Sequence, residues 1–288
     1  MLNSLTVPPP TPVDRTAYAE IVDVLRRGEV AVLTGAGMST ASGIPDYRGP
    51  DGQRRVQPMQ YSEFLADIEG RRRYWARAYA GWDRFAAAGP NASHRSVARL
   101  QASGVLSGII TQNVDGLHQA AGARDLIELH GNLDRVVCLD CNRGYRREEV
   151  HRWLAEANPS FGGGADGVVR PDGDVVLPAE IVSQFTLVAC PHCGSDRLKP
   201  DVVFFGGAVA RPLVDQAFAL VERSSALLVL GSSLQVMSGY RFVRRAAARS
   251  IPVAVITRGP TRGDAETSIR VDALLEDVLP GLASSVES

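Results

Sequence analysis

The chain has 288 residues, of which 45% are hydrophobic and 22% charged, and its formal net charge at pH 7 is −1. This composition is typical of a globular protein with one large domain, or with one domain that carries a smaller insert. A near-neutral charge argues against nonspecific binding to nucleic acid, and no apolar run approaches the roughly 20 residues of a membrane span. Met1–Pro12 lacks the basic and apolar regions of a secretory signal. We therefore expect a cytoplasmic protein with no nucleic-acid or membrane partner.

Short apolar runs rich in β-branched residues alternate with helical patterns along the chain. Their continuous hydrophobicity predicts strands buried on both faces. Alternation of such strands with helices predicts an α/β fold with a Rossmann-like, doubly wound parallel sheet. The predicted strands are Val30–Leu33, Val105–Ile110, Leu126–Leu129, Ala226–Leu230 and Val253–Ile256, and the predicted helices are Tyr18–Arg27, Ser93–Ala102, Pro212–Ser224 and Gly239–Arg249.

Glycines follow the first predicted strand and indicate a phosphate-binding loop. Gly35, Ala36, Gly37 and Ser39 lie in this loop, where glycine lets the backbone approach a pyrophosphate and the next helix would offer its N-terminal N–H groups. Thr40 stands where a third glycine is usual, so a plain tight turn is an alternative. No acidic residue follows a second strand at the distance needed to bind a ribose, which disfavours an ordinary dehydrogenase.

A loop with two charged residues follows, beginning at Pro45, which would stop a helix. Asp46, Tyr47 and Arg48 lie just past the phosphate site. The arginine is placed to reach a phosphate, and a solvated salt bridge is the alternative.

Polar side chains also follow two later strands. Gln112, Asn113 and Asp115 come directly after Val105–Ile110, and ligands of open α/β sheets bind at the carboxyl ends of strands. A carboxamide beside a carboxylate suits recognition of another carboxamide, such as that of nicotinamide; an Asx-capped helix start would explain one of the three residues. Gly231–Ser233 form a second loop of the phosphate- or ribose-binding kind.

One of the five histidines, His130, is a candidate general base. It closes the apolar run that begins at Ile127 and precedes a glycine, and the pKa of histidine lies near neutrality. A structural histidine is the alternative. Of the others, His94 and His151 are expected at the surface or in a helix cap, His118 is expected to be structural, and His192 lies inside a cysteine pair.

All four cysteines fall in two C-x-x-C pairs, Cys138/Cys141 and Cys190/Cys193. Two such pairs predict a closed, tetrahedral zinc site, although the gap between them exceeds the roughly 15–20 residues of the commonest pattern. Local disulfides or redox-active pairs are the alternative. The zinc would also hold together the loop-rich tract Asn158–Pro178, which has little apolar material. With no cysteine left for other disulfides, a reducing compartment is expected.

In this order, the motifs resemble those of the sirtuins, a family of NAD-dependent protein lysine deacylases, over about Tyr18–Leu279. The matching segments are Gly35–Ser39, Gly43–Arg48, Thr111–Asp115, Leu129–Gly131, both cysteine pairs, Lys199–Gly206 and Gly231–Val236. The segments Arg73–Arg77, Pro171–Asp174, Ser238–Arg241 and Gly259–Arg262 are similar to the class II branch of the family. The resemblance implies an NAD-binding domain of 1–44, 91–134 and 199–288 and a small helical and zinc-binding domain of 45–90 and 135–198.

The resemblance implies NAD and zinc as cofactors and acylated-lysine proteins or peptides as partners. The acyl group would pass from lysine to ADP-ribose with release of nicotinamide, with His130 as the base and Asn113 and Asp115 orienting the nicotinamide. The peptide would bind as an added strand, contacting Phe205, Gly206, Leu234 and Val236. Further contacts with NAD are implied for Gly35, Ala36, Gly37, Ser39, Asp46, Tyr47, Arg48, Gln112, Gly231, Ser232, Ser233, Thr257, Gly259 and Leu275.

The chain departs from the pattern of many relatives at Gly207, where they have an acidic residue, and at Thr257, where they have asparagine. The first change would affect peptide contacts and the second NAD affinity. Tyr74 and Arg77 share a helix face and resemble the pair with which desuccinylating sirtuins bind an acyl carboxylate. They predict a preference for acidic acyl groups such as glutaryl; the alternative is a core tyrosine and a surface arginine.

Other functions stay open at this point. Mono-ADP-ribosylation of proteins shares the nicotinamide-releasing step, and a non-catalytic NAD- or zinc-binding adaptor would keep the same cysteines. A nucleic-acid-binding zinc ribbon is disfavoured because the cysteine segment lacks a basic and aromatic face.

Overall fold

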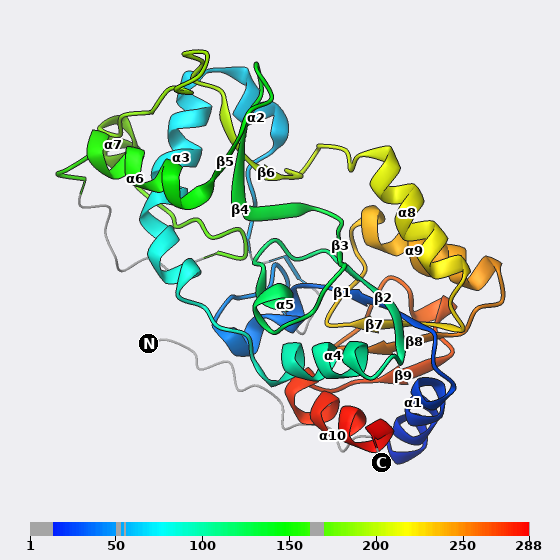
Figure 1. The fold of residues 1–288 in the computed structure, drawn as a ribbon. Helices are drawn as coiled ribbons and strands as arrows, with labels where there is room; N and C mark the ends of the chain where they lie inside the picture. The colour runs from blue at the N-terminus through cyan, green and yellow to red at the C-terminus, as the bar shows by residue number, and fades with distance from the viewer. Residues whose placement is uncertain (1–13, 50–52, 55, 162–169, 288) are drawn as a thin grey trace.

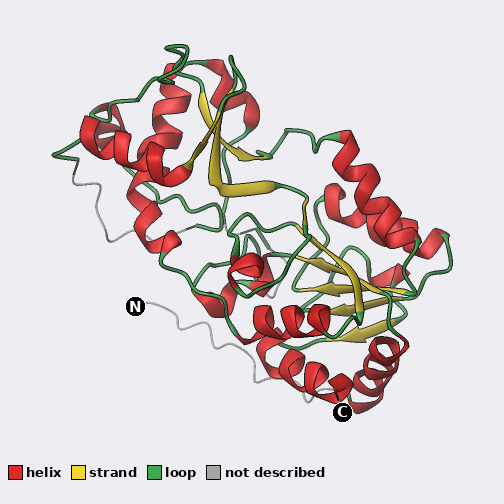
Figure 2. Ribbon diagram, in the orientation of Figure 1, coloured by secondary structure: helices red, strands yellow, loops and turns green. Residues whose placement is uncertain are grey.

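The main sheet has six parallel strands in the order β3-β2-β1-β7-β8-β9. We describe a computed structural model, which covers residues 14–49, 53–54, 56–161 and 170–287. Each predicted strand is present, and the α/β class is confirmed (Figures 1 and 2). The strands are β1 (Val30–Thr34), β2 (Leu106–Thr111), β3 (Ile127–Glu128), β7 (Ala226–Leu230), β8 (Val253–Ile256) and β9 (Ile269–Val271). The last is only three residues long and was not predicted.

Helices cover both faces of this sheet (Figure 1). Along β1, Val30 and Val32 pack on one face and Ala31 and Leu33 on the other, because successive side chains of a strand point to opposite sides. The first face is covered by α1 (Arg15–Arg27), α4 (Ala92–Ala102) and α10 (Leu275–Glu287), and the second by α8 (Arg211–Glu222) and α9 (Met237–Ala248). Hence the strands are buried throughout, as their continuous hydrophobicity predicts.

Two histidines, His94 and His118, are buried. His94 completes the capping box of α4, where its Nδ1 accepts from the Asn91 N–H, so of the two expected positions the helix cap is confirmed. Its ring is buried rather than exposed. It meets the buried His118 ring edge-on at 5.0 Å. His118 is structural, as expected: its Nε2 lies 3.0 Å from Thr34 Oγ1 inside the core.

A smaller module carries a three-stranded antiparallel sheet, β5-β4-β6, which Figure 1 shows away from the parallel sheet. An aromatic core that includes Phe64, Trp75 and Phe185 packs inside it. The module therefore has an apolar core of its own, and the expectation that zinc holds the tract Asn158–Pro178 together stays a prediction. Its elements are β4 (Gly131–Cys138), β5 (Gly144–Arg146), β6 (Leu198–Val202), α2 (Tyr61–Ala66), α3 (Ile68–Ala86), α6 (Arg147–Ala157) and α7 (Ala179–Ser183).

Parts of the sequence-based expectations fall outside the described residues. Met1–Pro12 and residues 162–169 of the loop-rich tract are among them, and the described residues before Pro178 in that tract form turns and irregular backbone, as predicted. The division into two domains stays a prediction. None of the helices in the described part of the chain combines the length and apolarity that a membrane crossing requires.

Candidate functional site

The strand order reverses between β1 and β7, so the loops that leave their carboxyl ends run in opposite directions. Ligands of doubly wound sheets bind at such a switch point. A cavity of about 870 Å³ opens there, within the roughly 300–1,000 Å³ range of small-molecule sites. Its lining includes all three predicted strand-end segments: Gly35–Gly37 after β1, Gln112–Asp115 after β2 and Gly231–Ser233 after β7.

Glycines allow the loops after β1 and β7 to touch. The Gly37 N–H donates to the Gly231 carbonyl at 2.8 Å, and a Cβ on Gly37 would lie 2.8 Å from Gly231 Cα. Gly231 also has a φ of +61°, which favours glycine. A Cβ on Gly35 would lie 2.7 Å from Ser232 Cβ. Only glycine permits the two loops to come this close. These glycines therefore determine the shape of the site, in addition to leaving room for a phosphate.

The helix expected after the first glycine loop is replaced by two short 3₁₀ helices, η1 (Ala36–Met38) and η2 (Thr40–Ser42). Gly43 ends the second in the left-handed region, with a φ of 85°, and Pro45 follows. The expected α-helix N-terminus is therefore absent from this described segment. The 3₁₀ turns instead bring the Ser39 side chain, which is 1% exposed, under the loop that follows β2.

Ser39 joins Asn113 and Asp115 into one hydrogen-bonded cluster. Its hydroxyl donates to Asp115 Oδ2 at 2.6 Å, and Asn113 Nδ2 donates to Ser39 Oγ at 3.1 Å and to the Gly35 carbonyl at 3.0 Å. These bonds use both N–H hydrogens of Asn113, so its side chain meets a ligand through the carbonyl oxygen, an acceptor. Burial raises the pKa of Asp115, while the bonds from Ser39 and from the Leu117 N–H oppose that rise.

Both ring nitrogens of His130 have partners. Nδ1 lies 2.9 Å from the Gln112 carbonyl and Nε2 lies 2.8 Å from Ser238 Oγ. Burial lowers the pKa of His130, and the bond to the Gln112 carbonyl partly opposes this. The imidazole is therefore neutral at pH 7, as a general base must be. Ser238 was not predicted as a site residue; its sequence signal was only its place in the Ser238–Arg241 motif.

The side chain of Gln112 ties neighbouring loops together. Its Nε2 donates to Ser232 Oγ at 3.0 Å and to the Thr34 carbonyl at 3.2 Å. Gln112, in the loop after β2, thus connects the end of β1 with the loop after β7.

Two predicted ligand contacts, Gly259 and Arg77, are absent from the cavity lining among the described residues. The Gly259 N–H donates to Asp272 Oδ1 at 3.2 Å, and its carbonyl accepts from Arg270. The other predicted contacts line the cavity: Gly35, Ala36, Gly37, Ser39, Asp46, Tyr47, Arg48, Tyr74, Gln112, Asn113, Asp115, His130, Phe205, Gly206, Gly231, Ser232, Ser233, Leu234, Val236, Thr257 and Leu275.

Arg77 lies behind the cavity wall in an ion pair. Its Nη2 lies 3.0 Å from Asp174 Oδ2, and its Nε donates to the Val175 carbonyl at 2.9 Å. Burial and the neighbouring Asp172 raise the pKa of Asp174 to about 7. The cavity itself is lined here by Tyr74 and Asp172. Asp172 was missed because its loop is distant in sequence from every other lining segment, although its Pro171–Asp174 motif stands out.

The four cysteine sulfurs fit one tetrahedral ion. All lie within 4.8 Å of one another, with 3.6 Å between Cys138 and Cys193 and 3.8 Å between Cys141 and Cys190. A tetrahedron with Zn–S bonds of about 2.3 Å has sulfurs about 3.8 Å apart. Burial raises the pKa of Cys190, but the hydrogen bond from the Tyr145 hydroxyl and the backbone bonds from His192 and Cys193 together outweigh it and lower that pKa to about 6. The donor set therefore suits zinc.

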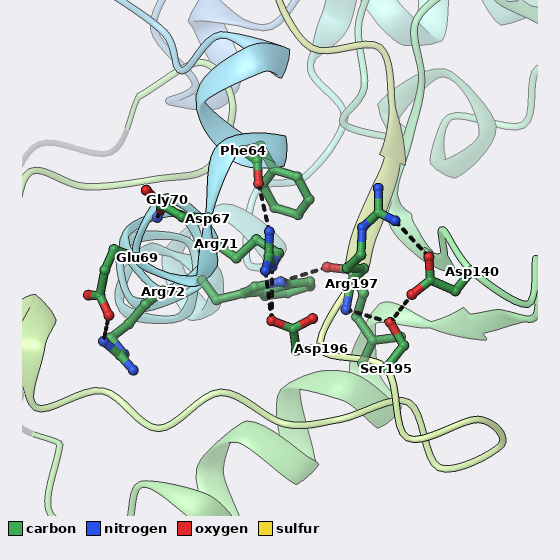
Figure 3. A network of polar contacts seen from close by, with 12 residues as sticks. Phe64, Asp67, Glu69, Gly70, Arg71, Arg72, Asp140, Ser195, Asp196 and Arg197 are labelled. Atoms are coloured by element: carbon green, nitrogen blue, oxygen red, sulfur yellow. Dashed lines mark hydrogen bonds and ion pairs between the residues drawn. The ribbon is translucent and has the colours of Figure 1, made fainter.

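Polar contacts join the two cysteine pairs and fasten them to α3 (Figure 3). Asp140, inside the first pair, accepts from Ser195 Oγ at 2.5 Å and from Arg197 Nη1 at 2.7 Å, both just past the second pair. Asp196, which lies between Ser195 and Arg197, forms an ion pair with the buried Arg71 of α3 at 2.8 Å. The zinc site is thereby coupled to the helix that carries Tyr74 into the cavity.

Comparison with known proteins gives a consistent set of similarities. Residues 35–238 match the Sir2 family. The chain is 53% identical to NAD-dependent protein deacetylase 1 of Streptomyces coelicolor over 273 residues, covering 94% of this chain and 91% of that protein. It is 44% identical to NAD-dependent protein deacylase Sirt4 of Drosophila melanogaster, covering 90% and 84%. A solved structure of Sir2 with a p53 peptide and NAD+ superposes with a TM-score of 0.72 at 28% identity, covering 92% of this chain and 96% of that one.

Proposed function

The chain belongs to the Sir2 family of NAD-dependent protein deacylases, and from that premise we propose that His130 is the base for acyl transfer from lysine to ADP-ribose. The protein is an NAD-dependent lysine deacylase that uses NAD and zinc and acts on acylated proteins or peptides. The observation that carries the proposal is the position of His130 in the switch-point cavity, which the Ser39–Asn113–Asp115 cluster also lines. A reducing, cytoplasmic location is part of the proposal, supported by cysteines that serve as metal ligands.

The cavity suits a dinucleotide because two glycine loops meet at its floor and polar residues line it. When bound, NAD supplies an electrophilic ribose carbon and the hydroxyl that receives the acyl group. Ala36, Ser232 and Ser233 would hold the phosphates, and Arg48 also lines the cavity. Thr257 and Leu275 would contact the adenosine end.

Acceptor oxygens of Asn113 and Asp115 would orient the nicotinamide, whose carboxamide N–H groups are donors. The Ser39 bond holds the Asp115 carboxylate in place. His130 would then take a proton from a ribose hydroxyl at Nε2, while its Nδ1–H stays bonded to the Gln112 carbonyl. That carbonyl is positioned to stabilise the imidazolium which forms.

The peptide would bind as a strand between the segments of Phe205–Gly206 and Leu234–Val236, which line the cavity. Backbone pairing of this kind depends little on peptide sequence. We therefore expect broad tolerance of the peptide sequence.

We also propose that carboxylate-bearing acyl groups are substrates, with Tyr74 lining the acyl end and Arg77 behind it. Arg77 would have to exchange its bond with Asp174 for one with the acyl carboxylate. The test compares the ratio of kcat/KM on glutaryl- and acetyl-lysine peptides in wild type, Arg77→Gln and the control Arg73→Gln, an exposed arginine on the same helix. A ratio that falls at least tenfold only in Arg77→Gln supports the proposal, and an unchanged ratio contradicts it. A ratio within one variant is independent of how much of that variant folds.

The main function is tested with a panel of acyl-lysine peptides and NAD, with products identified by mass spectrometry. Free lysine peptide, nicotinamide and O-acyl-ADP-ribose should form in equal amounts. ADP-ribose retained on protein, with no acyl-ADP-ribose, would identify the transferase reaction instead.

A further inference from the structure

We propose that Ser238 is a positioning residue for the general base, which holds the lone pair of His130 Nε2 toward the cavity until a substrate hydroxyl replaces it. This inference rests on the proposed role of His130.

The hydrogen bonds of His130 determine its tautomer. A backbone carbonyl can only accept, so the 2.9 Å contact with the Gln112 carbonyl requires the proton on Nδ1. In the neutral ring, Nε2 is then an acceptor, and the Ser238 hydroxyl, 2.8 Å away, must be the donor. Both His130 and Ser238 line the cavity. The serine oxygen therefore occupies a place where a hydroxyl that gives its proton to Nε2 would have to lie.

The position of Ser238 is set by the docking of α9. Ser238 is the second residue of this helix, and the next residue, Gly239, presses against Gln112: a Cβ there would lie 2.4 Å from Gln112 Oε1. Farther along, Phe242, Val243 and Ala246 are fully buried against the sheet. The first turn of α9 thus contacts both the base and the residue that holds the base. A larger residue at 239 would displace the Gln112 side chain or shift the first turn of α9.

The charges around His130 also favour its neutral form. Arg241, one turn along α9, lowers the pKa of His130, in addition to burial, and the N-terminus of α9 carries partial positive charge. The carboxylate of Asp115, in the loop after β2, is held by Ser39 and the Leu117 N–H. The Ser238 hydroxyl acts in the opposite direction, because it can turn and accept from the Nε2–H of the imidazolium, and such a charge-assisted bond is stronger than the bond to the neutral ring. Removing the hydroxyl should therefore lower the pKa of His130.

The experiment compares wild type, Ser238→Ala, Ser238→Thr and the control Ser285→Ala, whose hydroxyl bonds a carbonyl within α10. His130 is titrated by NMR without NAD, and kcat and KM for NAD are measured against pH. Ser238→Ala should lower the His130 pKa, move the acid limb of activity to lower pH and lower kcat about tenfold, which is roughly the effect of losing one hydrogen bond, with KM within about twofold of wild type. Ser238→Thr should restore these values, and Ser285→Ala should match wild type.

An unchanged His130 pKa and an unchanged pH profile in Ser238→Ala would overturn the inference, even if the variant were less stable. His130→Ala separates the two proposals. If it abolishes deacylation while Ser238→Ala has no effect, the proposed function stands and the inference fails. If His130→Ala keeps full activity, the proposed role of His130 itself fails.

Discussion

The hydroxyl of Ser39 donates a 2.6 Å hydrogen bond to the carboxylate of Asp115, although 76 positions separate the two residues. Ser39 lies between two 3₁₀ turns after β1, and Asp115 lies in the loop after β2. Because β1 and β2 are parallel neighbours, both loops emerge at the same end of the sheet. The bond therefore depends on strand order and on the turns that lower Ser39 beneath the second loop.

Replacement of Ser39 by alanine should impair use of NAD. The change removes a donor to Asp115 and a partner of Asn113, and a hydrogen bond to a charged group contributes about 1.5–3 kcal/mol. We expect kcat/KM for NAD to fall roughly 10- to 100-fold, as measured by nicotinamide release. Ser225→Ala, which alters an exposed serine bonded to backbone carbonyls, is the control. A loss of less than twofold in Ser39→Ala would contradict the proposed role of the cluster.

The acid limb of the deacylation rate should lie below pH 6.5, the ordinary pKa of histidine. Burial lowers the pKa of His130, and the base acts only when neutral, so activity is present above the lowered pKa and is lost as pH falls through it. The measurement is kcat against pH at saturating NAD. Substitution His130→Ala should cost about 10²–10⁴-fold in kcat and leave NAD binding, followed by calorimetry, nearly unchanged. A limb above pH 7 in the wild type would be inconsistent with a buried neutral base.

Stability should fall in mild acid because of two buried histidines. Burial lowers the pKa of His94 to about 4 and of His118 to about 3. Between these values and 6.5 the unfolded chain binds more protons, so their full contribution to stability is present above pH 6.5 and is lost as pH falls. Each should lower the free energy of unfolding by about 1.4 kcal/mol between pH 7.5 and 5.5.

Urea denaturation at both pH values, in wild type and His118→Asn, tests this. Zinc release in acid affects both proteins alike, so the difference between them isolates the histidine. The variant should start less stable at pH 7.5 but lose roughly 1.4 kcal/mol less on acidification. Equal losses in the two proteins would rule out the explanation.

Glycine at position 37 should be required for NAD binding. A Cβ there would lie 2.8 Å from Gly231 Cα, and backbone cannot yield as a flexible side chain does. Gly37→Ala should separate the two loops and weaken NAD binding at least about tenfold. A tenfold change corresponds to about 1.4 kcal/mol of binding free energy. Gly89→Ala, where a Cβ meets nothing within 4 Å, should bind NAD like wild type. Calorimetric titration with NAD measures both, and equal affinities would refute the loop-contact argument.

Removal of zinc should abolish activity by loosening the small module. The four sulfurs form a closed site with no open position for a catalytic water, so the metal's effect is structural. Tyr145, which bonds Cys190, packs edge-to-face on Trp153 at 5.3 Å, and tryptophan fluorescence should change when a chelator extracts the ion. Metal analysis should find one zinc per chain beforehand. Activity that survives complete extraction would show that the module does not need the ion.

Local patterns predicted most of the parallel sheet. The strands Ala226–Leu230 and Val253–Ile256 appear with the predicted bounds, because buried parallel strands need continuous apolar runs and those runs are visible in the sequence. The missed strand, Ile269–Val271, is too short to show a pattern. The helix expected after Gly35 did not form, because Gly43 turns the chain in the left-handed region before Pro45.

The sequence by itself determined the strand-end loops, the four metal ligands and the candidate base, since each of these depends on residue type at short spacing. Tertiary structure alone decided which side chains meet: Ser39 with Asp115, Ser238 with His130, and Arg77 with Asp174. The partners in these pairs lie far apart along the chain, so their contacts depend on strand order and helix docking, for which spacing carries no signal. Arg77 illustrates the consequence. Its resemblance to a known Tyr-x-x-Arg pair implied a ligand contact, and in this structure its partly buried guanidinium pairs with a carboxylate nearly one hundred positions away along the chain.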